Sequence, residues 1–274
     1  MKRVLVTGGM GYIGSHTVVQ LLEQGYEPIL ADNLSNSHPN IHDRIRQITG
    51  KSPLFHQVDL ADYEACTKLF EVEKDIDSII HFAAYKAVGE SVQEPIKYYR
   101  NNIDSLLNLL DCMTQFSVDS MVFSSSCTVY GQPDTLPVSE SAPFKKAESP
   151  YGYTKQVCER IIQDYVQADP KKKGIALRYF NPIGAHDSAL IGELPHGVPQ
   201  NLVPFVTQTA IGLRDELQVY GSDYDTADGS AVRDYIHVMD LAQAHVLAVE
   251  RLLKVKHTEN YEFSTWVQAK DTRS

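Results

Sequence analysis

Short apolar runs alternate with segments of helical spacing along the first 180 residues. The runs lie at 4–6, 28–31, 54–58, 78–83, 120–125 and 174–180, and each is long enough for a buried strand. Helices between the strands cover both faces of a parallel sheet, which explains why these runs are continuous instead of alternating. The pattern predicts an α/β protein with a doubly wound parallel Rossmann sheet.

The clearest long helix is predicted at residues 95–115. A proline stands at its first turn, and apolar residues recur at helical spacing on one side. We expect this face to lie in the core; its members are Ile96, Tyr99, Ile103, Leu106, Leu107 and Leu110.

The regular alternation ends near residue 180. Prolines at 182, 195, 199 and 204 punctuate the following segment. We therefore predict two domains, a dinucleotide-binding domain over residues 1–180 and a smaller substrate-binding lobe over 181–274. The chain is expected to return in part to the first domain near 234–264.

A glycine-rich turn joins the first predicted strand to the first helix. Gly8, Gly11 and Gly14 allow close approach of a ligand, and the free N–H groups at the helix start attract phosphate oxygens. Asp32 ends the second predicted strand, where a carboxylate suits both hydroxyls of an adenosine ribose and repels a 2′-phosphate. The sequence predicts binding of NAD over NADP, although ordinary strand-to-helix turns also use glycine.

The carboxyl ends of the strands form the expected ligand edge of such a sheet. This edge brings together the segments 8–14, 32–37, 59–60, 82–86 and 124–128 with Asn181.

Tyr151 and Lys155 are four residues apart at the start of a predicted helix, so their side chains lie on the same face. A nearby ammonium favours the phenolate form of tyrosine, which would make Tyr151 a general base. The hydroxyl run at 124–126 precedes this helix and supplies a partner for proton transfer. An amphipathic helix start without catalytic function explains the pair equally well when it is taken alone.

The composition limits which binding partners and which kinds of site we expect for this chain. The net charge is −10, and the lysines at 171–173 are expected in a solvated loop, so nucleic acid and anionic membranes are not predicted partners. The four cysteines are widely spaced, which indicates reduced thiols in the cytoplasm. We expect no metal site and no membrane span.

The chain resembles the extended short-chain dehydrogenase/reductase family, and within it the branch that epimerises UDP-hexoses at C4. The resemblance runs from Lys2 to about Glu259. The strings that carry it are Tyr12-Ile13-Gly14-Ser15-His16, Asp32-Asn33-Leu34-Ser35-Asn36-Ser37, His81-Phe82-Ala83-Ala84, Lys86-Ala87-Val88-Gly89-Glu90-Ser91, Leu177-Arg178-Tyr179-Phe180-Asn181-Pro182 and Arg233-Asp234-Tyr235-Ile236-His237-Val238-Met239-Asp240.

The resemblance implies a role for each site residue. Ser126 is implied as the catalytic hydroxyl, Tyr151 as the base, and Lys155 as the partner of the nicotinamide ribose. Together with the strand ends, the residues expected to bind NAD are Gly8, Gly11, Tyr12, Ile13, Gly14, Asp32, Asn33, Asn36, Ser37, Asp59, Leu60, Phe82, Ala83, Ala84, Lys86, Asn101, Ser124, Tyr151, Lys155 and Phe180. Those expected to face a UDP-hexose are Lys86, Ser126, Tyr151, Asn181, Asn201 and Arg233.

The implied reaction interconverts UDP-glucose and UDP-galactose. Tyr151 takes the proton of the 4-hydroxyl, directly or through Ser126, while hydride leaves C4 for NAD. The 4-keto sugar then turns over and receives hydride on its other face. The resemblance also implies a homodimer. A 4,6-dehydratase of the same family is disfavoured because Cys127-Thr128 stands where that chemistry uses an Asp-Glu pair.

The match to the family stops after Tyr261, where Glu262-Phe263-Ser264-Thr265-Trp266 replaces a glycine-containing turn. We therefore expect a truncated chain with an incomplete substrate lobe. Two alternatives follow, an active epimerase and a weakly active or inactive NAD-binding protein of the same family.

Overall fold

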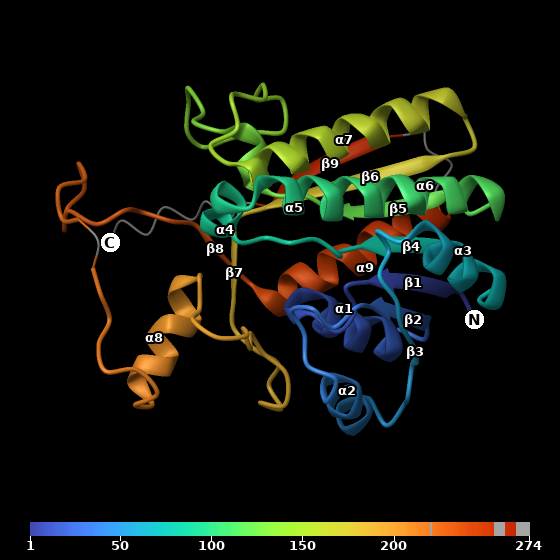
Figure 1. The fold of residues 1–274 in the computed structure, drawn as a ribbon, viewed down its shortest axis with the longest axis horizontal. Coiled ribbons are helices and arrows are strands. Elements are labelled where there is room, and N and C mark those ends of the chain that lie inside the picture. The colour runs from blue at the N-terminus through green and yellow to red at the C-terminus, as the bar shows by residue number, and fades with distance from the viewer. Residues whose placement is uncertain (220, 255–260, 267–274) are drawn as a thin grey trace.

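The computed structural model describes residues 1–219, 221–254 and the backbone of 261–266. Seven parallel strands in this part of the chain form one sheet in the order β3-β2-β1-β4-β5-β6-β9 (Figure 1). The order reverses between β1 and β4, which confirms the predicted doubly wound Rossmann sheet. The strands are β1 (Arg3–Thr7), β2 (Glu27–Asp32), β3 (Leu54–Gln57), β4 (Ser78–His81), β5 (Ser120–Ser124), β6 (Lys173–Tyr179) and β9 (Tyr261–Trp266).

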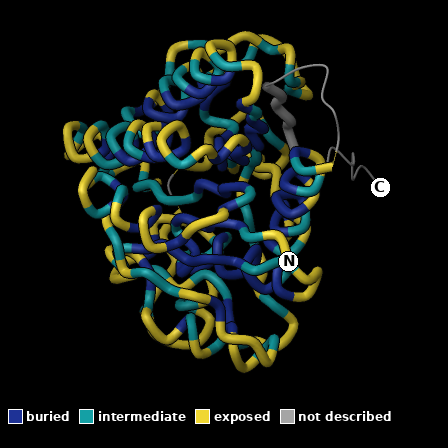
Figure 2. The backbone as a smooth tube through the Cα atoms, turned by 90° about the vertical axis from the view of Figure 1, so that its right-hand side faces the viewer, coloured by how far each residue is buried: buried dark blue, intermediate teal, exposed yellow. Residues whose placement is uncertain are grey.

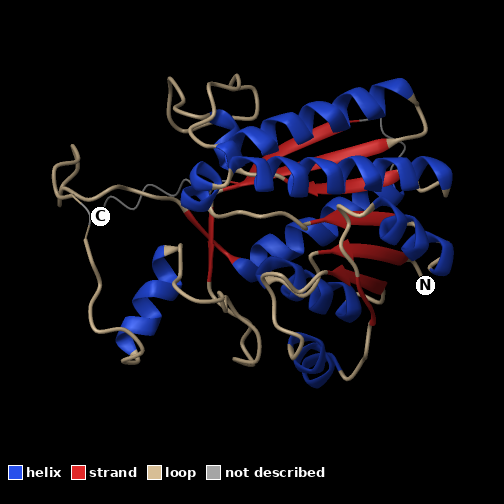
Figure 3. Cartoon of the chain, viewed as in Figure 1, coloured by secondary structure: helices blue, strands red, loops and turns tan. Residues whose placement is uncertain are grey.

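Helices cover both faces of this sheet (Figure 3). On one face pack α3 (Tyr63–Val72), α6 (Ser105–Gln115) and α7 (Pro150–Ala168), and on the other α1 (Tyr12–Glu23), α2 (Ile41–Thr49) and α9 (Val238–Lys254). Local sequence sets where α7 begins: Ser149 accepts a hydrogen bond from the Gly152 N–H at 3.1 Å, and Pro150 occupies the first turn.

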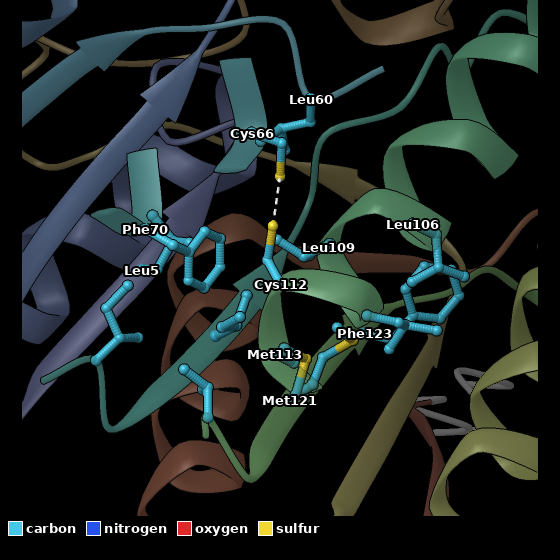
Figure 4. Close-up of a cluster of buried hydrophobic side chains, with 14 of the residues drawn as sticks. Leu5, Leu60, Cys66, Phe70, Leu106, Leu109, Cys112, Met113, Met121 and Phe123 are labelled. Carbon is cyan, nitrogen blue, oxygen red and sulfur yellow. Dashed lines mark hydrogen bonds between the residues drawn. The ribbon is translucent and has the colours of Figure 1, made fainter. Parts of the chain in front are cut away.

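Two apolar clusters, one on each face of the sheet, make up the core. In Figure 2 the buried parts of the backbone lie in the interior, and the exposed parts lie around them. Figure 4 shows part of one cluster, in which Cys66 of α3 lies beside Cys112 of α6 with their sulfur atoms 3.7 Å apart. Both thiols are free and buried. Strand residues such as Leu5 and Val4 alternate between the two clusters, as expected for a sheet that is covered on both sides.

The predicted helix at 95–115 is interrupted. It consists of α5 (Pro95–Tyr99), a π-helical turn at Arg100–Asp104 and α6. The predicted core face is wrong in part: Ile96 is 65% exposed and Leu107 42% exposed, whereas Leu106 and Leu110 are buried as expected. The π-helical turn holds one more residue than an α-turn, so the two halves do not share one continuous face.

The segment after β6 forms a separate small sheet and an isolated helix. β7 (Asn181–Ile183) pairs with β8 (Tyr235–His237) in parallel. Helix α8 (Leu202–Ala210) stands away from the large sheet in Figure 1. The chain then returns through α9, which packs on α1, and through β9, which pairs with β6. The domain boundary at residue 180 remains a prediction.

Lys172 corrects the expectation of a solvated lysine loop. This side chain is 4% exposed, and its Nζ donates to the carbonyl oxygens of Met113 at 3.2 Å and Val118 at 3.0 Å and to the Asp119 carboxylate at 2.9 Å. The lysine thus binds carbonyl groups at and just beyond the C-terminal end of α6, where a cation is favoured.

The strand β9 includes residues 262–266, where the match to the family was expected to stop. Residues 267–274, on which the expectation of a truncated lobe also depends, lie outside the described residues. No helix in the described part of the chain is both long and apolar enough to cross a membrane.

Remaining short elements lie near the carboxyl edge of the sheet. They are α4 (Val88–Gln93) and a 3-10 turn at Cys127–Tyr130.

Candidate functional site

The glycine turn between β1 and α1 lies at the carboxyl edge of the sheet, where its glycines carry no side chain that would keep a ligand from the backbone. Gly8 has φ +69°, and a Cβ on it would lie 2.9 Å from the Ala83 nitrogen. A Cβ on Gly14 would lie 2.2 Å from the Gly8 carbonyl oxygen. Helix α1 begins after Gly11 without a side-chain cap, so its first N–H groups face the edge as an anion site.

Asp32 fixes the end of β2 beside this turn. Its carboxylate accepts hydrogen bonds from the Met10 N–H at 3.0 Å, the Leu34 N–H at 2.9 Å and the Ser37 hydroxyl at 2.8 Å. The three donors fix the orientation of the carboxylate. An uncapped helix start over a glycine cradle, with a fixed carboxylate one strand away, fits the diphosphate and ribose of a dinucleotide.

Helix α7 and strand β5 bring the predicted catalytic residues together. Lys155 Nζ donates to the Ser124 carbonyl oxygen at 2.7 Å and lies 6.0 Å from the centre of the Tyr151 ring. The Ser126 side chain lies close enough to the Tyr151 hydroxyl to lower its pKa. Phenol, hydroxyl and ammonium therefore meet at one strand end, as the sequence predicts.

Burial governs the charges of this group. It lowers the pKa of Lys155 to about 8, a shift that Cys158 and Glu159 oppose. Burial also raises the pKa of Tyr151 well above its ordinary value, although the nearby Ser126 side chain works in the opposite direction. The expected phenolate-favouring effect of Lys155 is therefore outweighed by burial in the protein alone.

A buried ion pair between Glu159 and Arg178 holds the residues around the same strand end in place. Glu159, one turn after Lys155, accepts hydrogen bonds from Arg178 Nε at 3.0 Å and Nη2 at 2.7 Å, and from the Ser125 hydroxyl. Arg178 Nη1 also donates to the Tyr130 hydroxyl at 3.1 Å. This network joins α7, β5 and β6, so it fixes Ser126 relative to Tyr151. Sequence reasoning missed it.

Tyr179 is a further site residue that was missed. Its hydroxyl lies 2.5 Å from the Ser124 hydroxyl, and its electrostatic effect raises the pKa of Tyr151. Its ring centre is 6.0 Å from that of His245. Position at the end of β6 was the available signal, since the carboxyl ends of all strands meet at this edge.

The predicted substrate residues fall into two groups. Asn181 Nδ2 donates to the Asp234 carbonyl oxygen at 3.0 Å, which places it beside Arg233. Arg233 and Asp234 also act electrostatically on the thiol of Cys127, next to Ser126. Asn201 lies elsewhere and contacts Glu193, which also contacts Lys86.

Other predicted cofactor residues line the same edge. The Phe82 N–H donates to the Thr7 carbonyl oxygen at 3.1 Å, and its ring lies 4.5 Å from that of His245. Asn101 sits in the π-helical turn and donates to Asn102, which in turn bonds the backbone of Tyr85. The remaining members are partly buried or buried, except for the exposed Asn36 and Asp59; they are Tyr12, Ile13, Asn33, Leu60, Ala84 and Phe180. The binding role of each stays a prediction.

Three comparisons with known proteins agree. Residues 4–263 match the model of the NAD dependent epimerase/dehydratase family. A UDP-glucose 4-epimerase of Neisseria meningitidis serogroup A is 52% identical over 258 residues, 94% of this chain and 76% of that protein. A UDP-glucose 4-epimerase of Bacillus subtilis is 50% identical over 262 residues, 96% of this chain and 77% of that protein.

Among solved structures, a UDP-glucose 4-epimerase of Bifidobacterium longum in complex with NAD+ and UDP superposes with a TM-score of 0.92. It is 46% identical, and the superposition covers 97% of this chain and 78% of that one.

Proposed function

The chain belongs to the NAD dependent epimerase/dehydratase family, and from this premise we propose that it interconverts UDP-glucose and UDP-galactose with NAD as its cofactor. One observation carries the proposal: Tyr151, Ser126 and Lys155 meet at the strand end that faces the glycine turn. Its relatives named UDP-glucose 4-epimerase cover nearly the whole chain, which supports the same reaction.

NAD would be held by the glycine turn, Asp32 and the loop after β4. The uncapped start of α1 suits its diphosphate, and the Asp32 carboxylate suits the adenosine ribose and disfavours a 2′-phosphate. When bound, NAD supplies hydride chemistry at C4 of the hexose. The ring of Phe82, which follows β4, packs on the buried His245 with their ring centres 4.5 Å apart.

Tyr151 acts as the proton-transfer group. Ser126 lies beside the Tyr151 hydroxyl, so it is suited to pass the proton between the sugar 4-hydroxyl and the phenol. Lys155, bonded to Ser124, holds a positive charge near the phenol and stabilises its ionised form during transfer. The Glu159–Arg178 pair keeps this arrangement rigid.

The UDP group is bound by the residues at the start of β7 and β8. Arg233 is suited to the diphosphate because its guanidinium can donate two parallel hydrogen bonds. Asn181 lies beside it through the Asp234 carbonyl group. Lys86 and Asn201 are proposed to contact the same nucleotide sugar, and both hydrogen-bond the Glu193 carboxylate.

We also infer a homodimer in the cytoplasm. Ile96 and Leu107 are exposed along α5 and α6, and Tyr153 of α7 is 50% exposed beside Tyr99, with their ring centres 6.2 Å apart. Exposed apolar side chains on these neighbouring helices are suited to contact with a second copy of the chain. The four free thiols fit a reducing compartment.

Incubation of the purified chain with UDP-galactose tests the proposed reaction, with product identified by proton NMR. Appearance of UDP-glucose supports it. Retention of NAD without conversion would instead favour a weakly active or inactive NAD-binding protein.

A further inference from the structure

Glu193 contacts one residue that follows a strand of the large sheet and one that precedes helix α8. One oxygen of its carboxylate, Oε1, accepts hydrogen bonds from Lys86 Nζ at 3.2 Å and from Asn201 Nδ2 at 2.6 Å. Lys86 follows β4 of the large sheet, and Asn201 immediately precedes α8. A single atom thus connects two residues that are 115 positions apart (201 − 86).

The backbone that carries Glu193 is anchored to the large sheet. Ile191 is 2% exposed and belongs to the core cluster on the α1 face. The Leu190 carbonyl oxygen accepts a bond from Arg44 Nη1 at 3.0 Å, and Tyr12 OH donates to the Gly184 carbonyl oxygen at 2.7 Å. The segment that leads to Glu193 is therefore anchored to the large sheet.

The exposed fractions of the three side chains agree with Glu193 holding Lys86 and Asn201 in place, and not the reverse. The Glu193 side chain is 12% exposed and that of Lys86 is 45% exposed. Asn201 is exposed and begins the helix that stands away from the sheet in Figure 1. Lys86 has a long flexible side chain, so holding it in one geometry requires a partner that is itself fixed.

We propose that Glu193 is a positioning residue that sets Lys86 and Asn201 for binding of the UDP-sugar. The inference rests on the proposed function, because it gives both partners a role at the nucleotide sugar. Glu193 bears no part in proton transfer, since Tyr151, Ser126 and Lys155 meet at a different strand end. Its loss should therefore affect binding of the substrate more than turnover.

The primary test compares Glu193→Ala with the wild-type protein, both loaded with NAD. We expect the Kd for UDP, measured by calorimetry, and the KM for UDP-galactose to rise about tenfold or more, because hydrogen bonds to charged groups are strong. The kcat should change less than about threefold. Glu216→Ala, an exposed glutamate of the same lobe, is the matched control and should bind UDP like the wild type.

Glu193→Gln separates positioning from charge, because its amide oxygen still accepts from both donors. Its Kd and KM should stay within about threefold of wild type. A KM below that of the wild type would show that the negative charge of Glu193 weakens substrate binding by pairing with Lys86. That result would overturn the proposal. Equal losses in kcat/KM and kcat, with an unchanged Kd for UDP, would overturn it as well.

A cycle of Lys86→Met, Asn201→Ala and the double variant tests the connection even if Glu193→Ala does not fold. Because both residues act through one carboxylate, the double variant should weaken UDP binding at least threefold less than the product of the single effects. Independent effects would refute the connection. If the wild-type chain binds UDP but converts no sugar, the proposed reaction fails, and the UDP titrations still decide the role of Glu193.

Discussion

Lys155 and Ser124 are joined by a 2.7 Å hydrogen bond from the lysine Nζ to the serine carbonyl oxygen. This bond ties the helix that carries Tyr151 to the strand that leads to Ser126. It also commits the ammonium to a buried position, where its pKa falls to about 8. The arrangement of Tyr151, Ser126 and Lys155 therefore requires the positive charge of Lys155 to be removed from water, which costs free energy.

Lys155→Met should show this cost as a pH dependence of stability. The folded-state pKa of Lys155 lies below its ordinary value of 10.5, so the unfolded chain binds more protons between about pH 8 and 10.5. The free energy of unfolding of the wild type relative to the variant should rise across this window by about 3 kcal/mol, at 1.36 kcal/mol per unit. Urea unfolding at several pH values measures it. Lys171→Met, at an exposed position, should show no such trend.

Tyr151→Phe should remove turnover and leave NAD in place. The change deletes only the phenol hydroxyl that lies beside Ser126. General acid–base groups typically contribute about 10²–10⁴-fold, so the kcat should fall by that factor. The NAD content released on denaturation should match that of the wild type. Near-normal turnover would exclude Tyr151 as the proton-transfer group.

Gly14→Ala should disrupt the dinucleotide cradle. The new Cβ would lie 2.2 Å from the Gly8 carbonyl oxygen, so the turn must shift, at a cost of about 1–3 kcal/mol. We expect a lower Tm and little bound NAD. Gly89→Ala is the control, because its Cβ would meet only the Gln200 side chain at 3.9 Å. Equal NAD content in the two variants would show that the turn does not hold the cofactor.

Glu159→Ala should be among the most destabilising single changes on α7. It removes the buried carboxylate to which Arg178 Nε and Nη2 donate, and breaking a buried pair costs about 3–5 kcal/mol. The measurement is the free energy of unfolding in urea. Asp164→Ala breaks the exposed Arg160–Asp164 pair on the same helix and should unfold much like the wild type. Equal stability of the two variants would contradict a supporting role for the network.

Local patterns predicted six of the seven strands of the large sheet. The strand β9 was not predicted, and β3 is an edge strand with Leu54 46% exposed, not the buried strand that was expected. The glycine turn, Asp32 and the Tyr151–Lys155 spacing each depend on neighbours within one strand–turn–helix unit. The carboxyl ends of parallel strands meet at one edge, which extends such local signals to the candidate site.

Contacts between distant segments could not be predicted in this way. The π-helical turn breaks the regular spacing, so Ile96 and Leu107 were wrongly expected in the core. Lys172 was expected in water because its carbonyl partners lie more than 50 positions away. Glu193 carries no local motif, and its role depends on Lys86 and Asn201 meeting at the same oxygen.

The central claim is that hydride leaves C4 of the sugar and returns to C4 within the site. UDP-galactose labelled with deuterium at C4 tests this claim most directly. Hydride that leaves C4 and returns to the other face is never exchanged with water. The purified chain, followed by NMR and mass spectrometry, should yield UDP-glucose that keeps its deuterium at C4. Absence of conversion, or UDP-glucose whose C4 position carries hydrogen from the solvent, would contradict the account.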